Sequence, residues 1–277
     1  MIVMHPFTKN TLDWYTSHKR SLPWRDTTDP YAVFISEFML QQTQVSRVQP
    51  KFELFLKTYP TIHDVAQAKL SDILVLWVGL GYNRRAKYLY ESAKYIVKNH
   101  NGIIPDDVLT LQKISGIGPY MAGAICAFAY NKPVLVIDAN VKRVMNHVFG
   151  ITEKEIPQKL QSLIPQKSAR DFYNALMDIG SYYYKKNANY QDYPYKKFCH
   201  FYLGKPIPPL KKYKQPSFKG SNRYYRGQIL KLFLHTSTIP LDKVEQFEEK
   251  EKYLSAITQL EKEGFLIQEN NQVYLKK

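Results

Sequence analysis

Cysteine is scarce in this chain of 277 residues: only Cys126 and Cys199 occur, far apart in the sequence. Two distant thiols exclude a disulfide framework of the kind that stabilises small secreted domains, and a reducing cytoplasm is the simplest setting. The seven histidines are scattered and lack the spacing typical of metal ligands. We therefore expect no metal site.

Long apolar runs are also absent. No run approaches the length that spans a membrane, and the first residues show no basic segment followed by an apolar core. We expect a protein without a secretory signal or a membrane partner. Its predicted location is the cytoplasm of a bacterium or archaeon, in association with the nucleoid.

Acidic residues are outnumbered, with 24 Asp and Glu against 39 Lys and Arg, a net charge of +15. This balance favours a polyanionic partner, first of all nucleic acid, although a generally basic proteome would give the same excess. The last segment, 217–277, has 10 basic and 8 acidic residues, or +2, which leaves +13 on residues 1–216. The electrostatic attraction is therefore expected mainly from the first 216 residues.

Apolar residues recur at steps of three and four, which predicts a chain of helices. The predicted ranges are 8–20, 31–41, 44–58, 61–67, 71–78, 83–99, 106–114, 119–130, a helix after Asp138, 155–164 and 168–184, with Ser71 and Asp106 as N-caps. Prolines at 206, 208, 209 and 216 indicate an extended linker over 203–216. Three further helices near 224–234, 244–248 and 252–264, and a hairpin at 270–271, predict a small winged-helix-like module over 217–277.

A tight turn between two predicted helices contains Gly116 and Gly118. Two glycines let the backbone turn sharply, so that consecutive N–H groups point outward at the start of the next helix. Such a turn is an anion site, and a DNA phosphate fits it.

Two carboxyl groups stand out. Glu37 lies in a strongly apolar predicted helix, where burial would raise its pKa and keep it protonated. Asp138 directly precedes a helix, where backbone N–H groups and the helix dipole would keep it ionised. Each has an ordinary alternative role, Glu37 as a glutamate with a satisfying partner and Asp138 as a plain N-cap. Together they offer the acid and the carboxylate that glycosidic bond cleavage needs.

If the bond joins a base to DNA, the base must leave the duplex before it can be cleaved. The polar run that contains Gln41, Gln42 and Thr43 can fill the resulting gap. Tyr82, on a glycine-flanked turn, can also fill it, with Arg84 and Arg85 beside it for phosphates. Tyr82 has the alternative role of a core aromatic at a turn.

Five motifs in order resemble the helix-hairpin-helix DNA glycosylases, and most closely the MutY adenine DNA glycosylases. They are Pro23-Trp-Arg, Ser36-Glu-Phe-Met-Leu-Gln-Gln-Thr-Gln-Val, Gly79-Leu-Gly-Tyr, Gly116-Ile-Gly-Pro-Tyr and Asp138-Ala-Asn-Val-Lys-Arg-Val. The resemblance covers roughly residues 6–185. It implies an all-α, two-lobed fold followed by the small α+β module, with one lobe from 1–25 and 135–202 and the other from 26–134.

The resemblance also implies residue roles. Glu37 would protonate adenine and help to activate water, Asp138 would stabilise the oxocarbenium ion or form a transient adduct, and Asn140 would support Asp138. Tyr120 would lie beside the sugar, at a position where related bifunctional enzymes carry a lysine, so base removal without strand cleavage is expected. The residues implied in substrate and DNA binding are Trp24, Arg25, Gln41, Gln42, Thr43, Leu80, Tyr82, Arg84, Gly116, Gly118, Lys142 and Arg143.

The chain departs from the family in two places. Most relatives bind an iron–sulfur cluster with four cysteines, but Tyr184, Tyr190 and Tyr193 fall where three of them would be, and only Cys199 remains. One thiolate cannot hold a cluster that needs four ligands, so we expect no cofactor. The chain is also too short for the additional domain that checks for 8-oxoguanine in many relatives.

We therefore predict a monomeric, monofunctional DNA glycosylase that acts on double-stranded DNA and removes adenine mispaired with 8-oxoguanine or guanine. A mismatch thymine or uracil glycosylase of the same superfamily is the nearest alternative. A catalytically inactive mismatch-binding protein and a glycosylase-lyase are the others. Whether residues 217–277 touch DNA stays open at this point.

Overall fold

A computed structural model describes residues 4–185, 187–211 and 217–276, so the predicted linker 203–216 lies partly outside the described residues. The chain divides into two compact units: residues 1–37 with 105–213, and residues 38–104 with 214–277. This division groups the glycine hairpin with the first helix, and the C-terminal module with the helices that follow residue 38. The partition predicted from the sequence divides the chain elsewhere and stays a prediction.

The first unit is helical, and its helices begin where the sequence supplies a cap or a proline. Pro6 and Pro119 occupy first helical positions, and Asp107 and Asp138 cap helices with their side chains. The elements are α1 (Pro6–His18), the first part of α2 (Pro30–Leu40), α7 (Val108–Gln112), α8 (Pro119–Tyr130), α9 (Ala139–Phe149), α10 (Ile156–Gln161) and α11 (Ala169–Tyr183).

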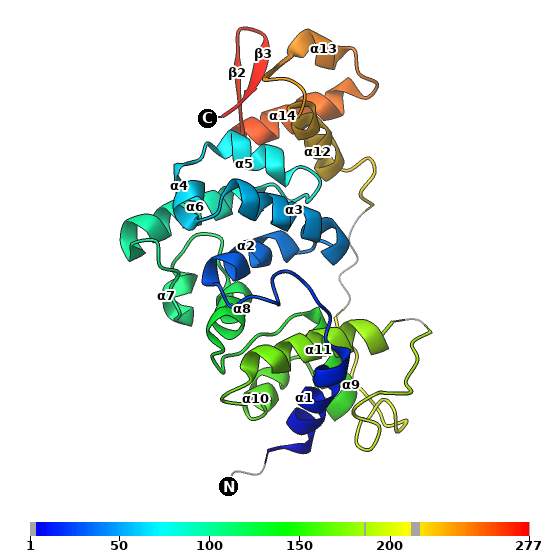
Figure 1. The fold of residues 1–277 in the computed structure, drawn as a ribbon. Helices are drawn as coiled ribbons and strands as arrows, with labels where there is room; N and C mark the ends of the chain where they lie inside the picture. Colours follow the sequence, from blue (N-terminus) through cyan, green and yellow to red (C-terminus); the bar gives the residue numbers. More distant parts are fainter. Residues whose placement is uncertain (1–3, 186, 212–216, 277) are drawn as a thin grey trace. The chain divides into compact units, whose positions relative to one another are not determined.

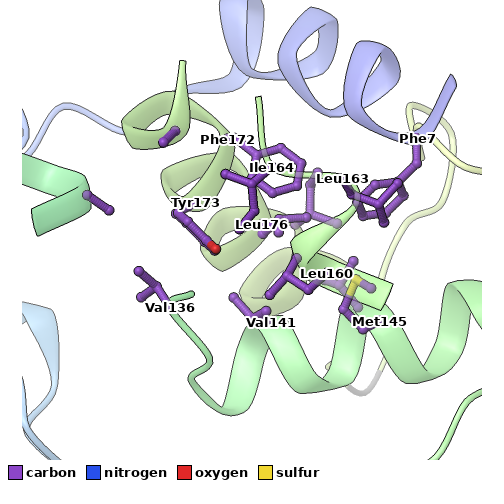
Figure 2. Close-up of a cluster of buried hydrophobic side chains, with 14 of the residues drawn as sticks. Phe7, Val136, Val141, Met145, Leu160, Leu163, Ile164, Phe172, Tyr173 and Leu176 are labelled. Carbon is purple, nitrogen blue, oxygen red and sulfur yellow. The ribbon is translucent and has the colours of Figure 1, made fainter. Parts of the chain in front are cut away.

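The core of the first unit lies between α1, α9 and α11, and Figure 2 shows part of it. Tyr173 and Leu176 of α11 are fully buried together with Val141 and Met145 of α9. Phe7 of α1 stacks on Tyr195 with ring centroids 4.8 Å apart. This packing holds the beginning of α9, and with it Asp138, in a defined place.

The second unit contains the remaining helices of the first half of the chain. They are the last part of α2, then α3 (Val45–Thr58), α4 (Ile62–Gln67), α5 (Leu70–Trp77) and α6 (Arg84–His100). Thr61 and Asp64 form a capping box at the start of α4. The turn between α5 and α6 holds Gly79, Gly81 and Tyr82, all at positive φ.

The C-terminal module belongs to the same second unit and packs through α12 against α5 (Figure 1). Its elements are α12 (Asn222–Leu232), β1 (Thr238–Pro240), α13 (Leu241–Glu245), α14 (Lys250–Lys262), β2 (Leu266–Glu269) and β3 (Gln272–Leu275). The strands form an antiparallel sheet in the order β1-β3-β2, with Ile239 opposite Val273 and Gln268 opposite Val273 on the other side. The predicted three helices and hairpin are present. Strand β1 was not predicted, because it has only three residues and ends in a proline.

The helices predicted from periodicity are all present, with ends within three residues of the predicted ones. Two predicted N-caps are wrong. Lys69 rather than Ser71 precedes α5, and Asp107 rather than Asp106 caps α7, accepting a hydrogen bond from the Thr110 N–H at 2.8 Å. In the described part of the chain no helix is both long and apolar enough to cross a membrane.

Candidate active site

Glu37 is the one charged residue of α2, a helix whose sequence is otherwise apolar apart from Ser36. The helix begins after Asp29, whose carboxylate accepts hydrogen bonds from the N–H groups of Tyr31 and Ala32 at 3.1 and 3.2 Å. The helical period turns Glu37 inward, and only 5% of the residue is exposed. The sequence expectation of a buried glutamate is met.

Burial, and after it the negative charge of Asp138, raises the pKa of Glu37 to about 8. The Tyr120 hydroxyl donates a hydrogen bond to the Glu37 carboxyl and, with the positive charge of Arg25, acts weakly against this rise. At neutral pH the carboxyl therefore keeps its proton, because desolvation outweighs the stabilisation of its charged form.

Asp138 caps α9, as the sequence predicts. Its Oδ1 accepts a hydrogen bond from the Val141 N–H at 2.7 Å, and its Oδ2 accepts one from the Asn140 side-chain amide at 2.9 Å. Burial nevertheless raises the pKa of Asp138, while these donors and the nearby Arg143 act to lower it. The sequence predicted the effect of the cap, but the cost of desolvation depends on tertiary packing.

The two carboxyl groups have unlike surroundings. Asp138 has hydrogen-bond donors from α9, whereas Glu37 has a tyrosine hydroxyl in an apolar surrounding. Asp138 therefore ionises first, and its charge then disfavours ionisation of Glu37. When the pair holds one proton, that proton therefore lies on Glu37.

A buried ion pair lies beside this acid, and sequence reasoning missed half of it. Nη1 of Arg25 donates to Oδ2 of Asp178 at 2.6 Å, and Nε of the more exposed Arg20 donates to Oδ1 at 2.6 Å. Asp178 belongs to α11 and is 3% exposed. The signal in the sequence that could have revealed Asp178 was a lone aspartate on the apolar face of a predicted helix. Asp178 fixes Arg25, and its charge offsets that of the guanidinium near Glu37.

Other predicted site residues also lie in the first unit. Trp24 is buried next to Arg25 in the sequence, and Tyr120 lies in the first turn of α8. Gly116 adopts φ +83° and Gly118 precedes α8, both exposed, so the hairpin has the turn that the sequence predicts. Lys142 pairs with Glu153 at 2.9 Å.

A second group of predicted residues lies in the second unit, around the turn between α5 and α6. The Thr43 hydroxyl donates to the Leu80 carbonyl at 3.1 Å, and the Leu80 side chain is buried. Gln41 is partly buried, whereas Gln42 is exposed and has φ +55°. Tyr82 is 38% exposed, and Arg84 is exposed while pairing with Glu263 at 3.1 Å.

The expected phosphate contact by Arg85 is wrong. Its residue exposure is 6%, and its guanidinium donates to the carbonyls of Phe38, Met39, Leu80 and Gly81 and to the Thr43 hydroxyl, at 2.8 to 3.1 Å. The paired arginines in the sequence look alike, but helical geometry turns one outward and the other inward. Arg85 braces the turn that carries Tyr82.

The region where the family resemblance places cluster ligands is built from aromatic side chains here. Tyr184, Tyr193 and Cys199 meet in a chain of hydrogen bonds, in which the Tyr193 hydroxyl lies next to the Tyr184 hydroxyl and 3.1 Å from the Cys199 Sγ. Tyr190 donates to the Tyr183 carbonyl at 2.6 Å. A single thiol among phenols does not fit an iron–sulfur cluster, which needs four thiolate ligands. Among the described residues no cluster of three His, Cys, Asp or Glu fit to hold a metal ion occurs.

Residues 35–166 match the family described as HhH-GPD superfamily base excision DNA repair protein. This range includes Glu37, the hairpin, Tyr120 and Asp138. Over this range the chain is similar to the helix-hairpin-helix DNA glycosylase superfamily. The resemblance to this superfamily inferred from five short motifs is thereby confirmed.

Curated relatives of this chain include adenine DNA glycosylases, in agreement with the MutY resemblance. The adenine DNA glycosylase of Buchnera aphidicola subsp. Baizongia pistaciae is 36% identical over 73% of this chain and 60% of its own length. The adenine DNA glycosylase of Mycobacterium tuberculosis is 38% identical over 64% of this chain and 61% of its own length. The chain thus spans about 60% of the length of these relatives.

Solved structures agree on the fold. A thermostable thymine-DNA glycosylase superposes with a TM-score of 0.66 at 26% identity, over 72% of this chain and 95% of that one. An endonuclease III in a trapped covalent intermediate with DNA superposes with a TM-score of 0.62 at 17% identity, over 73% of this chain and 99% of that one. The second likeness bears on fold alone.

Proposed function

We propose that this chain is a monofunctional DNA glycosylase that hydrolyses the N-glycosidic bond of adenine mispaired with 8-oxoguanine or guanine. The observation that carries the proposal is the protonated, buried Glu37 whose pKa is raised in part by the charge of Asp138. A carboxylic acid and a carboxylate with unlike proton affinities are the two groups that cleavage of a glycosidic bond uses.

The proposed reaction starts when Glu37 transfers its proton to a ring nitrogen of adenine. The bond between the sugar carbon and the base then breaks, its electrons leave with the base, and Asp138 stabilises the positive sugar or attacks it. Water adds to the sugar carbon and returns a proton to the Glu37 carboxylate. Asn140 and the Val141 N–H hold Asp138 in place through this sequence.

Duplex DNA is the proposed substrate, bound by a monomer. Chemistry on a base requires that the nucleotide be flipped out of the stack, which in turn needs a grip on the backbone. Gly116 and Gly118, exposed at the start of α8, offer backbone N–H groups for a phosphate. The net charge of +15 adds long-range attraction, so binding should weaken steeply with salt.

Strand cleavage is not part of the proposed activity. A lyase step needs an amine that attacks the sugar carbon, and this chain has Tyr120 where related bifunctional enzymes carry a lysine. The Tyr120 hydroxyl is engaged with Glu37. Borohydride should therefore trap no covalent complex with substrate DNA.

We also propose that the protein works without an iron–sulfur cluster. Support comes from the Tyr184, Tyr193 and Cys199 chain, which joins by hydrogen bonds and ring packing the segments that four thiolates would otherwise join. Metal analysis of the purified protein should find no stoichiometric iron, and excision should survive a chelator. Stoichiometric iron whose removal abolishes folding would contradict this.

A thymine or uracil glycosylase is the second candidate, because a thymine-DNA glycosylase is among the structural relatives above 25% identity. Adenine is preferred because several curated relatives at 35% to 39% identity are adenine DNA glycosylases. The test is a panel of duplexes with A opposite 8-oxoguanine, A opposite G, T opposite G and U opposite G. Release of adenine supports the proposal, and release of only thymine and uracil overturns it.

The Asp138→Asn variant is the control for that panel. Asparagine keeps an oxygen that accepts from the Val141 N–H, so α9 stays capped, but the charge is lost. The variant should bind the A:8-oxoguanine duplex as the wild type does. Its rate of adenine release should be lower by about a hundredfold or more. Binding with no base release by either protein would favour the inactive mismatch-binding protein.

A further inference from the structure

The tyrosine at the turn between α5 and α6 is held in a conformation that side chains rarely adopt. Tyr82 has φ +48° and follows Gly79 and Gly81 at φ +97° and +72°. Such a backbone persists only where its surroundings impose it. Arg85 donates to the Gly81 carbonyl at 2.9 Å, and the Trp77 indole donates to the same carbonyl at 3.2 Å.

The exposed aromatic ring at this turn lies against an arginine side chain. Tyr82 is 38% exposed, and Arg223 of α12 lies with its guanidinium carbon 5.8 Å from the ring centroid. Nη1 of Arg223 also donates to the Tyr82 hydroxyl at 2.8 Å. The C-terminal module thus supplies a residue to the turn, 141 positions away in the sequence.

Three more cationic side chains, two from α6 and one from α12, meet at Glu263. Arg84, next to the turn, and Arg226, one turn of helix from Arg223, both pair with Glu263, at 3.1 and 2.6 Å. Lys87 donates to the Glu263 carbonyl at 2.7 Å. Glu263 joins α6, α12 and the end of α14, so the module is fixed to the helix that follows the Tyr82 turn.

We propose that the module is part of the DNA-binding surface, with Arg223 contacting a backbone phosphate next to the base on which Tyr82 stacks. An aromatic ring with arginine beside it is the combination that grips a base and its phosphate. The module's net charge of only +2 does not oppose this, because its contribution is local to Arg223. This inference rests on the proposed function, which makes DNA the ligand.

The experiment measures the Kd of the full-length protein for a duplex with a 2′-fluorinated adenosine, which resists cleavage, opposite 8-oxoguanine. Arg223→Ala is compared with Lys231→Ala, which removes the same charge from the same helix at an exposed position. Arg223→Ala should weaken binding about tenfold and reduce the slope of log Kd against log salt by about 1. Lys231→Ala should change neither, and both should melt like the wild type.

Two further variants separate the roles of ring and cation. Tyr82→Ala should weaken binding about tenfold or more through lost stacking, with the salt slope unchanged. Arg223→Lys should restore the salt slope, since the charge is kept. Arg223→Ala should weaken binding less in the Tyr82→Phe variant than in the wild type, because Tyr82→Phe has already removed the hydrogen bond between the two residues.

Unchanged Kd and unchanged salt slope in a folded Arg223→Ala protein would overturn the inference and leave the module a packing role. Wild-type protein that binds the duplex but releases no adenine from the unmodified substrate would instead contradict the proposed function, while the binding comparison still decides the role of Arg223. Failure of the wild type to bind duplex DNA at all would overturn both.

Discussion

Gly180 of α11 lies against Asn140 of α9 so closely that a Cβ added at Gly180 would stand 2.6 Å from the Asn140 Cβ. Asn140 in turn donates to Asp138. The Arg143 guanidinium reaches the Gly180 carbonyl at 3.3 Å. The absence of a side chain in one helix therefore sets the position of the carboxylate at the start of another.

Gly180→Ala should push Asn140 away from α11 and displace Asp138 with it. We expect a stability loss of about 1–3 kcal/mol from overpacking and a loss of excision larger than unfolding explains. Gly227→Ala is the control, since it lies in helix α12 with open space where its Cβ would be and should be neutral or stabilising. Equal effects of the two substitutions, measured by urea unfolding and single-turnover excision, would contradict this account.

Asp178→Asn removes the charge that neutralises Arg25. The guanidinium of Arg25 would be left as an uncompensated buried charge, so we expect the free energy of unfolding to fall by about 3–5 kcal/mol. The charge of Arg25 would then act more strongly on Glu37, whose pKa it lowers, and the pH dependence of excision should move to lower pH. Arg20→Ala, at the exposed side of the same carboxylate, should cost below about 1 kcal/mol and leave the pH profile in place.

Tyr193→Phe removes a hydroxyl between Tyr184 and Cys199. Burial raises the pKa of Tyr193, so the group is a neutral hydrogen-bonding link. Its loss should lower the free energy of unfolding by about 1–2 kcal/mol. Tyr182→Phe, which alters an exposed tyrosine of the same region, should have no measurable effect. Matching melting temperatures for both variants would mean that the hydroxyl chain does not stabilise this loop.

Glu37 should make stability depend on pH. Its folded-state pKa of about 8 exceeds the ordinary value of 4.5, so the folded protein binds this proton more tightly than the unfolded chain does. The free energy of unfolding therefore falls as pH rises between these two values, and the loss is complete above the higher one. Glu37→Gln lacks this loss and should gain stability over the wild type toward alkaline pH, on the order of a few kcal/mol. A stability difference that does not vary with pH would contradict the raised pKa.

Much of the local structure followed from the sequence because its causes are local. The periodicity of apolar residues gave the helices, and the glycines of the hairpin gave the turn before Tyr120. The cap at Asp138 was likewise visible, since the acceptor and the N–H groups lie within three residues of each other.

What sequence reasoning missed depends on residues that are distant in the chain. Asp178 has no recognisable role until Arg25, 153 residues away, reaches it. Arg85 looks like a phosphate ligand until the carbonyls of α2 enclose it. The contact of Arg223 with Tyr82 likewise requires the C-terminal module to pack on the helices beside the Tyr82 turn, and no local pattern in either segment predicts that packing.

The most direct test of the carboxyl pair is the pH dependence of single-turnover adenine release from an A:8-oxoguanine duplex at saturating enzyme. The wild-type rate should hold through neutral pH and fall as pH rises through about 8, where Glu37 loses its proton. Glu37→Gln should release adenine at least about a hundredfold more slowly at neutral pH and show no such fall. A wild-type rate that rises through this range, or a Glu37→Gln rate equal to that of the wild type, would contradict the assignment of Glu37 as the proton donor.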